Sequence, residues 1–212
     1  MTETSVVVAA QDADLDGDLT VPDQARALVL FAHGSGSSRH SPRNRAVAEV
    51  LQASGLATLL FDLLTPAEEE IDLRTRALRF DIELLARRLG AATDWADGQP
   101  ELRSLPPAYF GASTGAAAAL VAAAERPAVQ AMVSRGGRPD LAGERLPLVQ
   151  APTLLIVGSR DELVVDLNRQ AAARMQAHVE LEIVEGATHL FEEPGTLEAV
   201  ADLARDWIIR WV

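Results

Sequence analysis

The chain is most informative at Tyr109-Phe110-Gly111-Ala112-Ser113-Thr114-Gly115. A short apolar run behind two prolines precedes Ser113 and an alanine-rich run follows it, so the serine lies where a buried strand becomes a helix. Gly111 and Gly115, two residues to either side, remove the side chains that would collide at a sharp turn. This spacing predicts that the turn exposes Ser113 as a nucleophile. Because glycine- and alanine-rich chains produce the same spacing by chance, the prediction depends on residues elsewhere.

The composition excludes several classes of protein. A length of 212 residues suits one domain, residues 1–212, and 48% hydrophobic and 24% charged residues are ordinary for a globular protein. A net charge of −12 disfavours nucleic acid and anionic membranes as partners. The chain has no cysteine and all 19 basic residues are arginine, which excludes thiolate sites, lysine Schiff bases and a phosphate-loop lysine. Since no basic leader and no apolar run of about 18 residues is present, we expect a cytoplasmic protein.

Apolar strands alternate with helices along most of the chain. We expect strands at 27–32, 57–64, 106–110, 131–134, 153–158 and 180–184. Ser41 is expected to cap the helix after the first of them, and Thr196 the last helix of the chain. We also expect a long helix from about Asp72, a polar connector over 95–105 and a helix over 164–175. The alternation predicts an α/β fold with a mostly parallel sheet covered by helices on both faces.

Two further strands are predicted before this alternation, at 5–10 and 15–21. Asp16-Gly17 is a dipeptide suited to a tight turn, and we expect it to join the two strands as a hairpin. The aspartates between positions 12 and 23 also resemble a calcium-binding EF-hand loop. The valine-rich segment before the loop and Pro22 within it oppose the flanking helices that an EF-hand needs. An acidic hairpin is therefore the favoured interpretation, and a calcium site is the alternative.

A serine nucleophile needs a base and a carboxylate that orients the base. His189 follows the last predicted strand and therefore belongs to the carboxyl edge of the sheet, where catalytic groups gather. His178 precedes that strand, and His33 belongs to a glycine-rich loop that an imidazole more often braces. Asp161, directly after the preceding strand, is the favoured acid, and Asp140 is the alternative.

The order Ser113, Asp161, His189 resembles that of α/β-hydrolases. The amino-acid sequences of three loops resemble those of the dienelactone hydrolase-like branch of that superfamily: His33-Gly34-Ser35-Gly36-Ser37-Ser38-Arg39-His40-Ser41-Pro42-Arg43-Asn44, Gly111-Ala112-Ser113-Thr114-Gly115 and Ser134-Arg135-Gly136-Gly137-Arg138-Pro139-Asp140-Leu141. The resemblance implies an eight-stranded sheet with an antiparallel first hairpin, and esterase or lactonase chemistry. Dienelactone hydrolase proper looks to use cysteine where this chain has Ser113, so its substrate does not carry over with the resemblance.

The superfamily pattern also implies which groups hold the oxyanion that forms on attack. The donors are the backbone amides of Thr114 and Ser35, with Gly36 in reserve. A nucleotide-binding turn at the same glycines is disfavoured because Arg39 occupies the position where GxGxxG needs its third glycine.

The loops at the carboxyl edge also carry four arginines: Arg39, Arg43, Arg135 and Arg138. Guanidinium groups match carboxylate geometry, so these side chains could bind an anionic group of the substrate, and Arg39, Arg135 and Arg138 are the candidate binding residues. The alternative is that they pair with acids of the protein as part of its scaffold. The short segment between the strands at 131–134 and 153–158 leaves no room for a lid domain.

These residues together predict a serine hydrolase that cleaves a small ester or lactone through an acyl-enzyme, with no metal or organic cofactor. Ser113 attacks, His189 transfers the proton and Asp161 orients the imidazole. Thioester or amide hydrolysis would use the same residues. A noncatalytic α/β-hydrolase scaffold that binds a partner is the alternative of a different class. The sequence leaves the oligomeric state open between monomer and homodimer.

Overall fold

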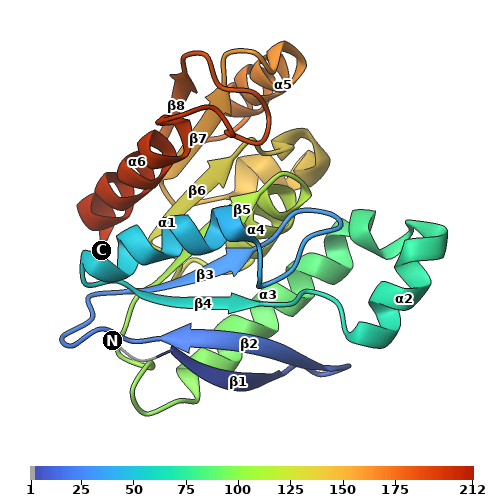
Figure 1. Cartoon of the computed structure of the whole chain (residues 1–212), viewed down its shortest axis with the longest axis vertical. Helices are drawn as coiled ribbons and strands as arrows, with labels where there is room; N and C mark the ends of the chain where they lie inside the picture. Colours follow the sequence, from blue (N-terminus) through green and yellow to red (C-terminus); the bar gives the residue numbers. More distant parts are fainter. Residues whose placement is uncertain (1–2) are drawn as a thin grey trace.

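The computed structural model describes residues 3–212 and is built on one eight-stranded sheet with the order β1-β2-β4-β3-β5-β6-β7-β8 (Figure 1). The strands are β1 (Glu3–Ala9), β2 (Asp14–Thr20), β3 (Leu28–Ala32), β4 (Ala57–Phe61), β5 (Pro107–Ala112), β6 (Ala131–Arg135), β7 (Thr153–Gly158) and β8 (Val179–Val184). β1 pairs antiparallel with β2, and β2 pairs antiparallel with β4. The other strands, β3 to β8, are all parallel to one another. The mostly parallel sheet with an antiparallel first hairpin is therefore confirmed.

Helices cover both faces of the sheet, as predicted (Figure 1). They are α1 (Pro42–Ala53), α2 (Pro66–Thr75), α3 (Ile82–Asp97), α4 (Thr114–Ala124), α5 (Glu162–Ala172) and α6 (Thr196–Trp211), with 3-10 segments η1 (Leu78–Phe80) and η2 (Pro139–Leu148). α1 and α6 pack on one face around the tilted pair Phe31 and Phe110, whose ring centroids lie 4.9 Å apart. α3 and α4 pack on the other face. The strands β3 to β7 are almost wholly buried because both of their faces are covered.

The hairpin forms, but the predicted position of its turn was wrong. The strands meet through residues 10–13, where the amide of Ala10 donates to the carbonyl of Ala13 at 2.8 Å. Asp16 and Gly17 lie inside β2 instead, and Gly17 pairs with Val6 on one side and Phe61 on the other. A Cβ at Gly17 would lie 3.2 Å from the Phe61 side chain, so the glycine allows close packing rather than a turn.

The predicted long helix from Asp72 was also wrong. Asp72 belongs to α2, which ends at Arg76 in a left-handed conformation with φ 56°. The η1 turn follows, and a new helix, α3, begins at Ile82 behind the capping side chain of Asp81. α3 runs to Asp97, so the first part of the expected connector at 95–105 is helical. Figure 1 shows α2 standing apart from the sheet beyond the carboxyl ends of β3 and β4.

The remaining differences are at element ends. Ser41 caps α1 as predicted, because its side chain accepts a hydrogen bond from the Asn44 amide. Thr196 is the first residue of α6 rather than its cap, and its hydroxyl donates to the carbonyl of Glu193 at 2.7 Å. The helix expected at 164–175 begins earlier, at Glu162.

Between β6 and β7 lies only η2, so the prediction of a fold without a lid domain is confirmed for residues 3–212. In that same range, no helix combines the length and the hydrophobicity needed to span a membrane.

Candidate active site

Ser113 lies on a strained turn between β5 and α4, with φ 52° and ψ −122°. Such dihedral angles are rare for L-residues and cluster at functional sites. The flanking glycines make the turn possible: a Cβ on Gly115 would lie 2.2 Å from the Ala32 carbonyl oxygen, and one on Gly111 would lie 2.5 Å from Cα of Ala116. The sequence therefore packs the turn so tightly against its neighbours that the serine holds an otherwise unfavourable backbone conformation.

His189 and Asp161 meet at the same carboxyl edge of the sheet. His189 comes from the loop after β8 and Asp161 from the loop after β7, and Nδ1 of the histidine lies 2.6 Å from a carboxylate oxygen of Asp161. Their side chains are 39% and 18% exposed, respectively. The carboxylate can only accept, so Nδ1 donates and Nε2 is left with its lone pair free to take a proton.

The loop after β6 connects this pair to the serine. The Ser113 amide donates to the carbonyl of Arg135 at 3.2 Å, and a Cβ on the next residue, Gly136, would lie 3.6 Å from Cε1 of His189. In the described part of the chain, the His189 ring makes a hydrogen bond to Asp161 and none to the Ser113 hydroxyl. Catalytic hydrogen bonds are often loose before a substrate binds.

Asp140, the alternative acid, is occupied elsewhere. Both of its carboxylate oxygens accept hydrogen bonds from the guanidinium of Arg138, at 2.8 Å each. The structure thus brings Asp161, and not Asp140, to His189.

His33 and His178 have other surroundings. His33 is buried, its Nε2 accepts the Leu63 amide at 3.0 Å, and its Nδ1 lies 3.0 Å from the Gly34 carbonyl. Burial lowers the pKa of His33, which keeps the ring neutral and suits it to bracing the loop. His178, at the amino end of β8, stacks on Trp207 with 5.7 Å between ring centroids.

The two residues whose amides are the predicted oxyanion donors, Ser35 and Thr114, contact each other. The Ser35 amide donates to the hydroxyl of Thr114 at 2.9 Å. The amide of Thr114 itself begins α4 and has no acceptor within that helix. Sequence reasoning missed the role of the Thr114 hydroxyl, because nothing in the local pattern indicates a contact with a loop 79 residues away.

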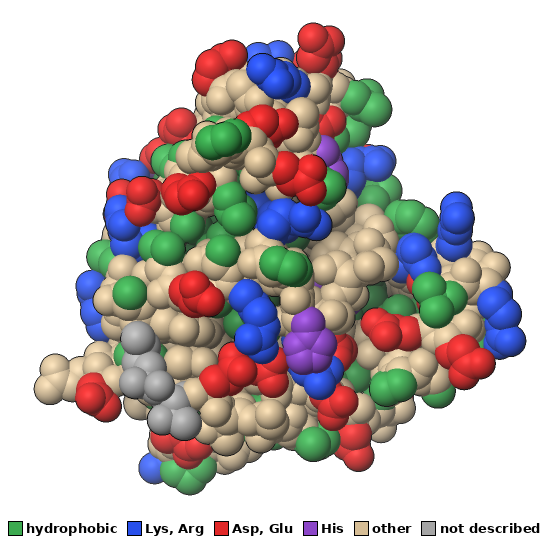
Figure 2. Space-filling view, viewed as in Figure 1, with side chains coloured by type: hydrophobic (Ala, Val, Ile, Leu, Met, Phe, Trp, Pro, Cys, Tyr) green, Lys and Arg blue, Asp and Glu red, His purple; other side chains and the backbone are tan. Residues whose placement is uncertain are grey.

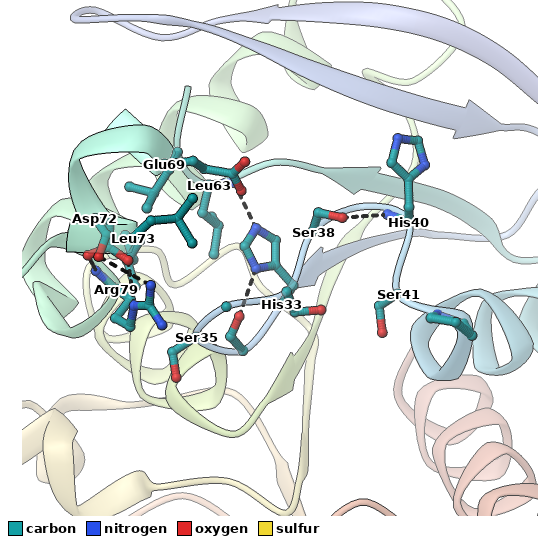
Figure 3. Close-up of a pocket in the computed structure, with 16 residues that line it drawn as sticks. His33, Ser35, Ser38, His40, Ser41, Leu63, Glu69, Asp72, Leu73 and Arg79 are labelled. Carbon is teal, nitrogen blue, oxygen red and sulfur yellow. Dashed lines mark hydrogen bonds and ion pairs between the residues drawn. The ribbon is translucent and has the colours of Figure 1, made fainter. Parts of the chain in front are cut away.

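A cavity of about 390 Å³ lies between the loop of residues 33–42, which contains Ser35, and the α2–η1 segment (Figure 3). Gly34 lines it, and a Cβ on Gly34 would lie 3.2 Å from Cβ of Ser113, so Gly34 lies between the cavity and Ser113, which is itself not one of the lining residues. Leu63 and Leu73 form an apolar part of its wall, and Glu69 contributes a carboxyl group. Burial, followed by the charge of Asp62, raises the pKa of Glu69. Glu69 was missed because no helix was expected before about Asp72.

Arg79 borders the same cavity and is held by Asp72 (Figure 3). Burial alone would raise the pKa of Asp72, but hydrogen bonds from the backbone and side chain of Arg79 outweigh it and the pKa is lowered. This ion pair therefore fixes the η1 turn against α2 as one wall of the cavity.

The candidate binding arginines divide into two groups. Arg39 pairs with Asp62, to which its amide also donates at 2.7 Å, and Arg138 pairs with Asp140. Arg135 is buried, and the one hydrogen bond that its side chain makes within residues 3–212, at 3.2 Å, goes to the side-chain oxygen of Asn44. Figure 2 shows acidic and basic side chains interspersed on the face that is drawn. Arg135 is the exception among the three candidates.

Comparisons with known proteins identify the family of the chain. A family model described as an alpha/beta hydrolase domain matches residues 25–204. A provisionally named phosphoribosyl transferase of Mycobacterium tuberculosis is 62% identical over 208 residues, a match that covers 98% of this chain and 46% of that protein. The chain therefore spans about half the length of the curated relatives that match it at this identity.

Solved structures give the same answer. A dienelactone hydrolase of Anabaena variabilis is 60% identical with a TM-score of 0.98, over 100% of this chain and 98% of that one. Est1E of Butyrivibrio proteoclasticus has a TM-score of 0.81 over 98% of both chains, but at 17% identity it shows the fold alone. The chain therefore belongs to the α/β-hydrolase family, and to its dienelactone hydrolase-like branch.

Proposed function

We propose that this protein is a serine hydrolase that cleaves small esters or lactones through an acyl-enzyme. The observation that carries the proposal is the 2.6 Å contact between His189 and Asp161 at the edge of the sheet where Ser113 stands on its strained turn. An imidazole oriented by a carboxylate, at the same edge of the sheet as a partly exposed serine, suits activation of a hydroxyl for attack.

The chemistry follows from the positions of these groups. Nε2 of His189 takes the proton of the Ser113 hydroxyl as its oxygen attacks the carbonyl carbon, and returns the proton to the departing alcohol oxygen. Asp161 stabilises the imidazolium that exists between these steps. Water then attacks the acyl-enzyme by the same route, which releases the acid and restores Ser113. The Thr114 amide is the first oxyanion donor. The Ser35 amide becomes the second when its hydrogen bond turns from the Thr114 hydroxyl to the substrate oxygen.

The cavity supports a small substrate. Its volume of about 390 Å³ is near the lower end of ligand pockets, and its leucines suit an apolar acyl or alcohol portion. The Anabaena relative is named for hydrolysis of dienelactone. We extend to this chain the bond type, an ester or lactone, and not that compound, because the nucleophile here is Ser113.

The transferase name of the Mycobacterium relative describes a protein about twice as long as this chain. Since residues 25–204 match a hydrolase domain, we assign hydrolysis to the shared part. Cytoplasmic location, the absence of a cofactor and the choice between monomer and homodimer remain expectations from sequence.

Labelling with a fluorophosphonate probe tests this function, together with a panel of short-chain aryl esters, thioesters and amides. We expect the wild-type protein to react with the probe and to hydrolyse at least the esters, and Ser113→Ala to do neither. Equal failure of both proteins, with both folded by circular dichroism, would favour the noncatalytic scaffold. A preference for thioesters or amides would keep the mechanism and change the substrate class.

A further inference from the structure

The loop that follows β6, residues 136–138, contacts both halves of the candidate active site. On one side, the amide of Arg138 donates to the Ser113 carbonyl at 3.1 Å. On the other side, a Cβ on Gly136 would lie 3.1 Å from the carbonyl oxygen of His189 and 3.6 Å from Cε1 of its ring. The conformation of this loop therefore sets where the Ser113 turn lies relative to His189.

The loop depends on contacts from outside to hold that conformation. Gly136 has φ 51°, and glycine gives up more backbone freedom on folding than any other residue. A Cβ on Gly137 would lie 2.0 Å from Oγ of Ser134 and 2.6 Å from Cβ of Ala116, so the loop packs on β6 and α4 with no spare room. The amide of Gly136 donates to the Ile156 carbonyl at 2.7 Å, which fixes one end of the glycine pair.

Asn168 of α5 holds the other end. Its side chain is fully buried, and Nδ2 donates to the Gly137 carbonyl at 3.0 Å and to the Val164 carbonyl of the same helix at 2.8 Å. Within residues 3–212, no other hydrogen bond joins α5 to the loop. Asparagine favours helices less than leucine does, and its Oδ1 is buried here without a partner among the described residues. The fold accepts both costs at a position that keeps an amide donor directed at the loop.

The same helix also carries the acid that orients the base. Asp161 is the N-cap of α5 and its carboxylate lies 2.6 Å from Nδ1 of His189. Asn168 lies about two turns further along the helix. One rigid element therefore contacts the base through Asp161 and the loop beside the nucleophile through Asn168. Because a misplacement of about 1 Å between reacting groups can lower the rate about a hundredfold, the second contact matters for the reaction.

We propose that Asn168 is a positioning residue, whose hydrogen bond to Gly137 holds the loop of residues 136–138 so that the Ser113 hydroxyl can reach Nε2 of His189. The proposal rests on the hydrolase function above and adds a buried residue that acts on the reaction through the backbone. The competing explanation is that Asn168 contributes to stability alone, in which case activity and stability change together.

Two substitutions separate these explanations. Asn168→Ala removes both hydrogen bonds. Asn168→Thr keeps nearly the same volume, and its hydroxyl can still donate to the Val164 carbonyl, as Thr93 of α3 does to the Leu89 carbonyl at 3.1 Å, but it is too short to reach Gly137. We expect kcat on one aryl ester to fall about tenfold to a hundredfold in both variants, with KM changed by less than about threefold. The melting temperature should fall less in Asn168→Thr than in Asn168→Ala. If Asn168→Ala does not fold, Asn168→Thr provides the test.

Thr153→Val is the matched control. The Thr153 side chain is also fully buried and donates to a backbone carbonyl, that of Ala151 at 2.9 Å, but it lies at the amino end of β7, at the opposite edge of the sheet. Its substitution should lower the melting temperature and leave kcat unchanged. A kcat that recovers in Asn168→Thr along with the melting temperature, or that falls equally in Thr153→Val, would overturn the proposal.

Hydrogen exchange followed by mass spectrometry tests the loop without turnover. The amides of Gly136 and Arg138 are hydrogen-bonded in the wild type, so we expect them to exchange at least about tenfold faster in Asn168→Thr and at the wild-type rate in Thr153→Val. If the wild type hydrolyses no ester, the hydrolase function fails and the exchange rates alone decide whether Asn168 holds the loop. Exchange in Asn168→Thr that equals the wild type contradicts the proposal in either case.

Discussion

Asp161 and Asp140 provide a clean comparison at the scale of single residues, because both follow strands at the same edge and only one reaches His189. Asp161→Asn keeps the shape and removes the charge that stabilises the imidazolium. We expect kcat to fall by about a hundredfold to ten-thousandfold with the melting temperature nearly unchanged. Asp140→Asn should lower kcat by less than about tenfold, since it breaks a contact with Arg138 alone. Steady-state rates on one aryl ester decide between them, and a larger loss in Asp140→Asn would reassign the acid.

The sequence predicts the positions of the single candidate catalytic groups better than their partners. Ser113, Asp161 and His189 each follow a predicted strand, and parallel strands bring their carboxyl ends to one edge whatever their order in the sheet. The contact of the Thr114 hydroxyl with the Ser35 amide depends on how the loop after β3 and the start of α4 are placed relative to each other. The lack of an acidic partner for Arg135 among residues 3–212 depends on where the acids of the fold lie. Neither property has a local signal.

At the scale of elements, Asp72 joins α2 to the η1 turn through hydrogen bonds to the amides of Leu78 and Arg79 and to the Arg79 side chain. Asp72→Asn should lower the free energy of unfolding at pH 7 by about 1–2 kcal/mol. The folded-state pKa of Asp72 is lowered, so its stabilisation is complete above the unfolded pKa of about 4 and is lost as the pH falls through the folded value. The difference between wild type and variant should therefore shrink below about pH 4.

Urea titrations at pH 7 and at pH 3.5 measure that difference. Asp94→Asn is the control, because Asp94 also pairs with an arginine, Arg126, but is exposed. Its effect should be smaller at both pH values. A difference between wild type and Asp72→Asn that is constant with pH would show that the carboxylate charge does not hold the turn.

The elements that sequence reasoning placed wrongly share a physical cause. Leu78, Ile82, Leu85 and Leu89 have helical spacing, but the left-handed Arg76 and the hydrogen bonds of Asp72 end one helix and start another within that spacing. Asp16-Gly17 has the composition of a turn, yet the strand pairing on both sides of Gly17 takes precedence over local preference. Local pattern identified the elements, and tertiary contacts fixed where they end.

At the scale of the whole molecule, the alternation of strands and helices predicted the class of sheet, but the attachment of the first hairpin to the body depends on long-range contacts. Arg88, in α3, provides one of them: its guanidinium contacts Asp12 in the hairpin turn at 2.9 Å and Glu68 at the start of α2 at 2.8 Å. Burial alone would raise the pKa of Glu68, but the hydrogen bonds from Arg88 and Thr65, together with the charge of Arg88, outweigh it and the pKa is lowered. One side chain thus ties three segments together.

Arg88→Met should therefore loosen the hairpin and α2 from the body together. Because the two carboxylates left behind are partly exposed and can regain water, we expect a loss of about 2–3 kcal/mol, at the low end for a broken buried pair. For a chain of this length that corresponds to a melting temperature lower by about 5–10 °C in calorimetry. Arg126→Met removes an exposed pair with Asp94 and should cost at most about 1 kcal/mol. Equal shifts in the two variants would mean that the buried pair adds no more than a surface one, and that apolar packing alone holds the hairpin to the sheet.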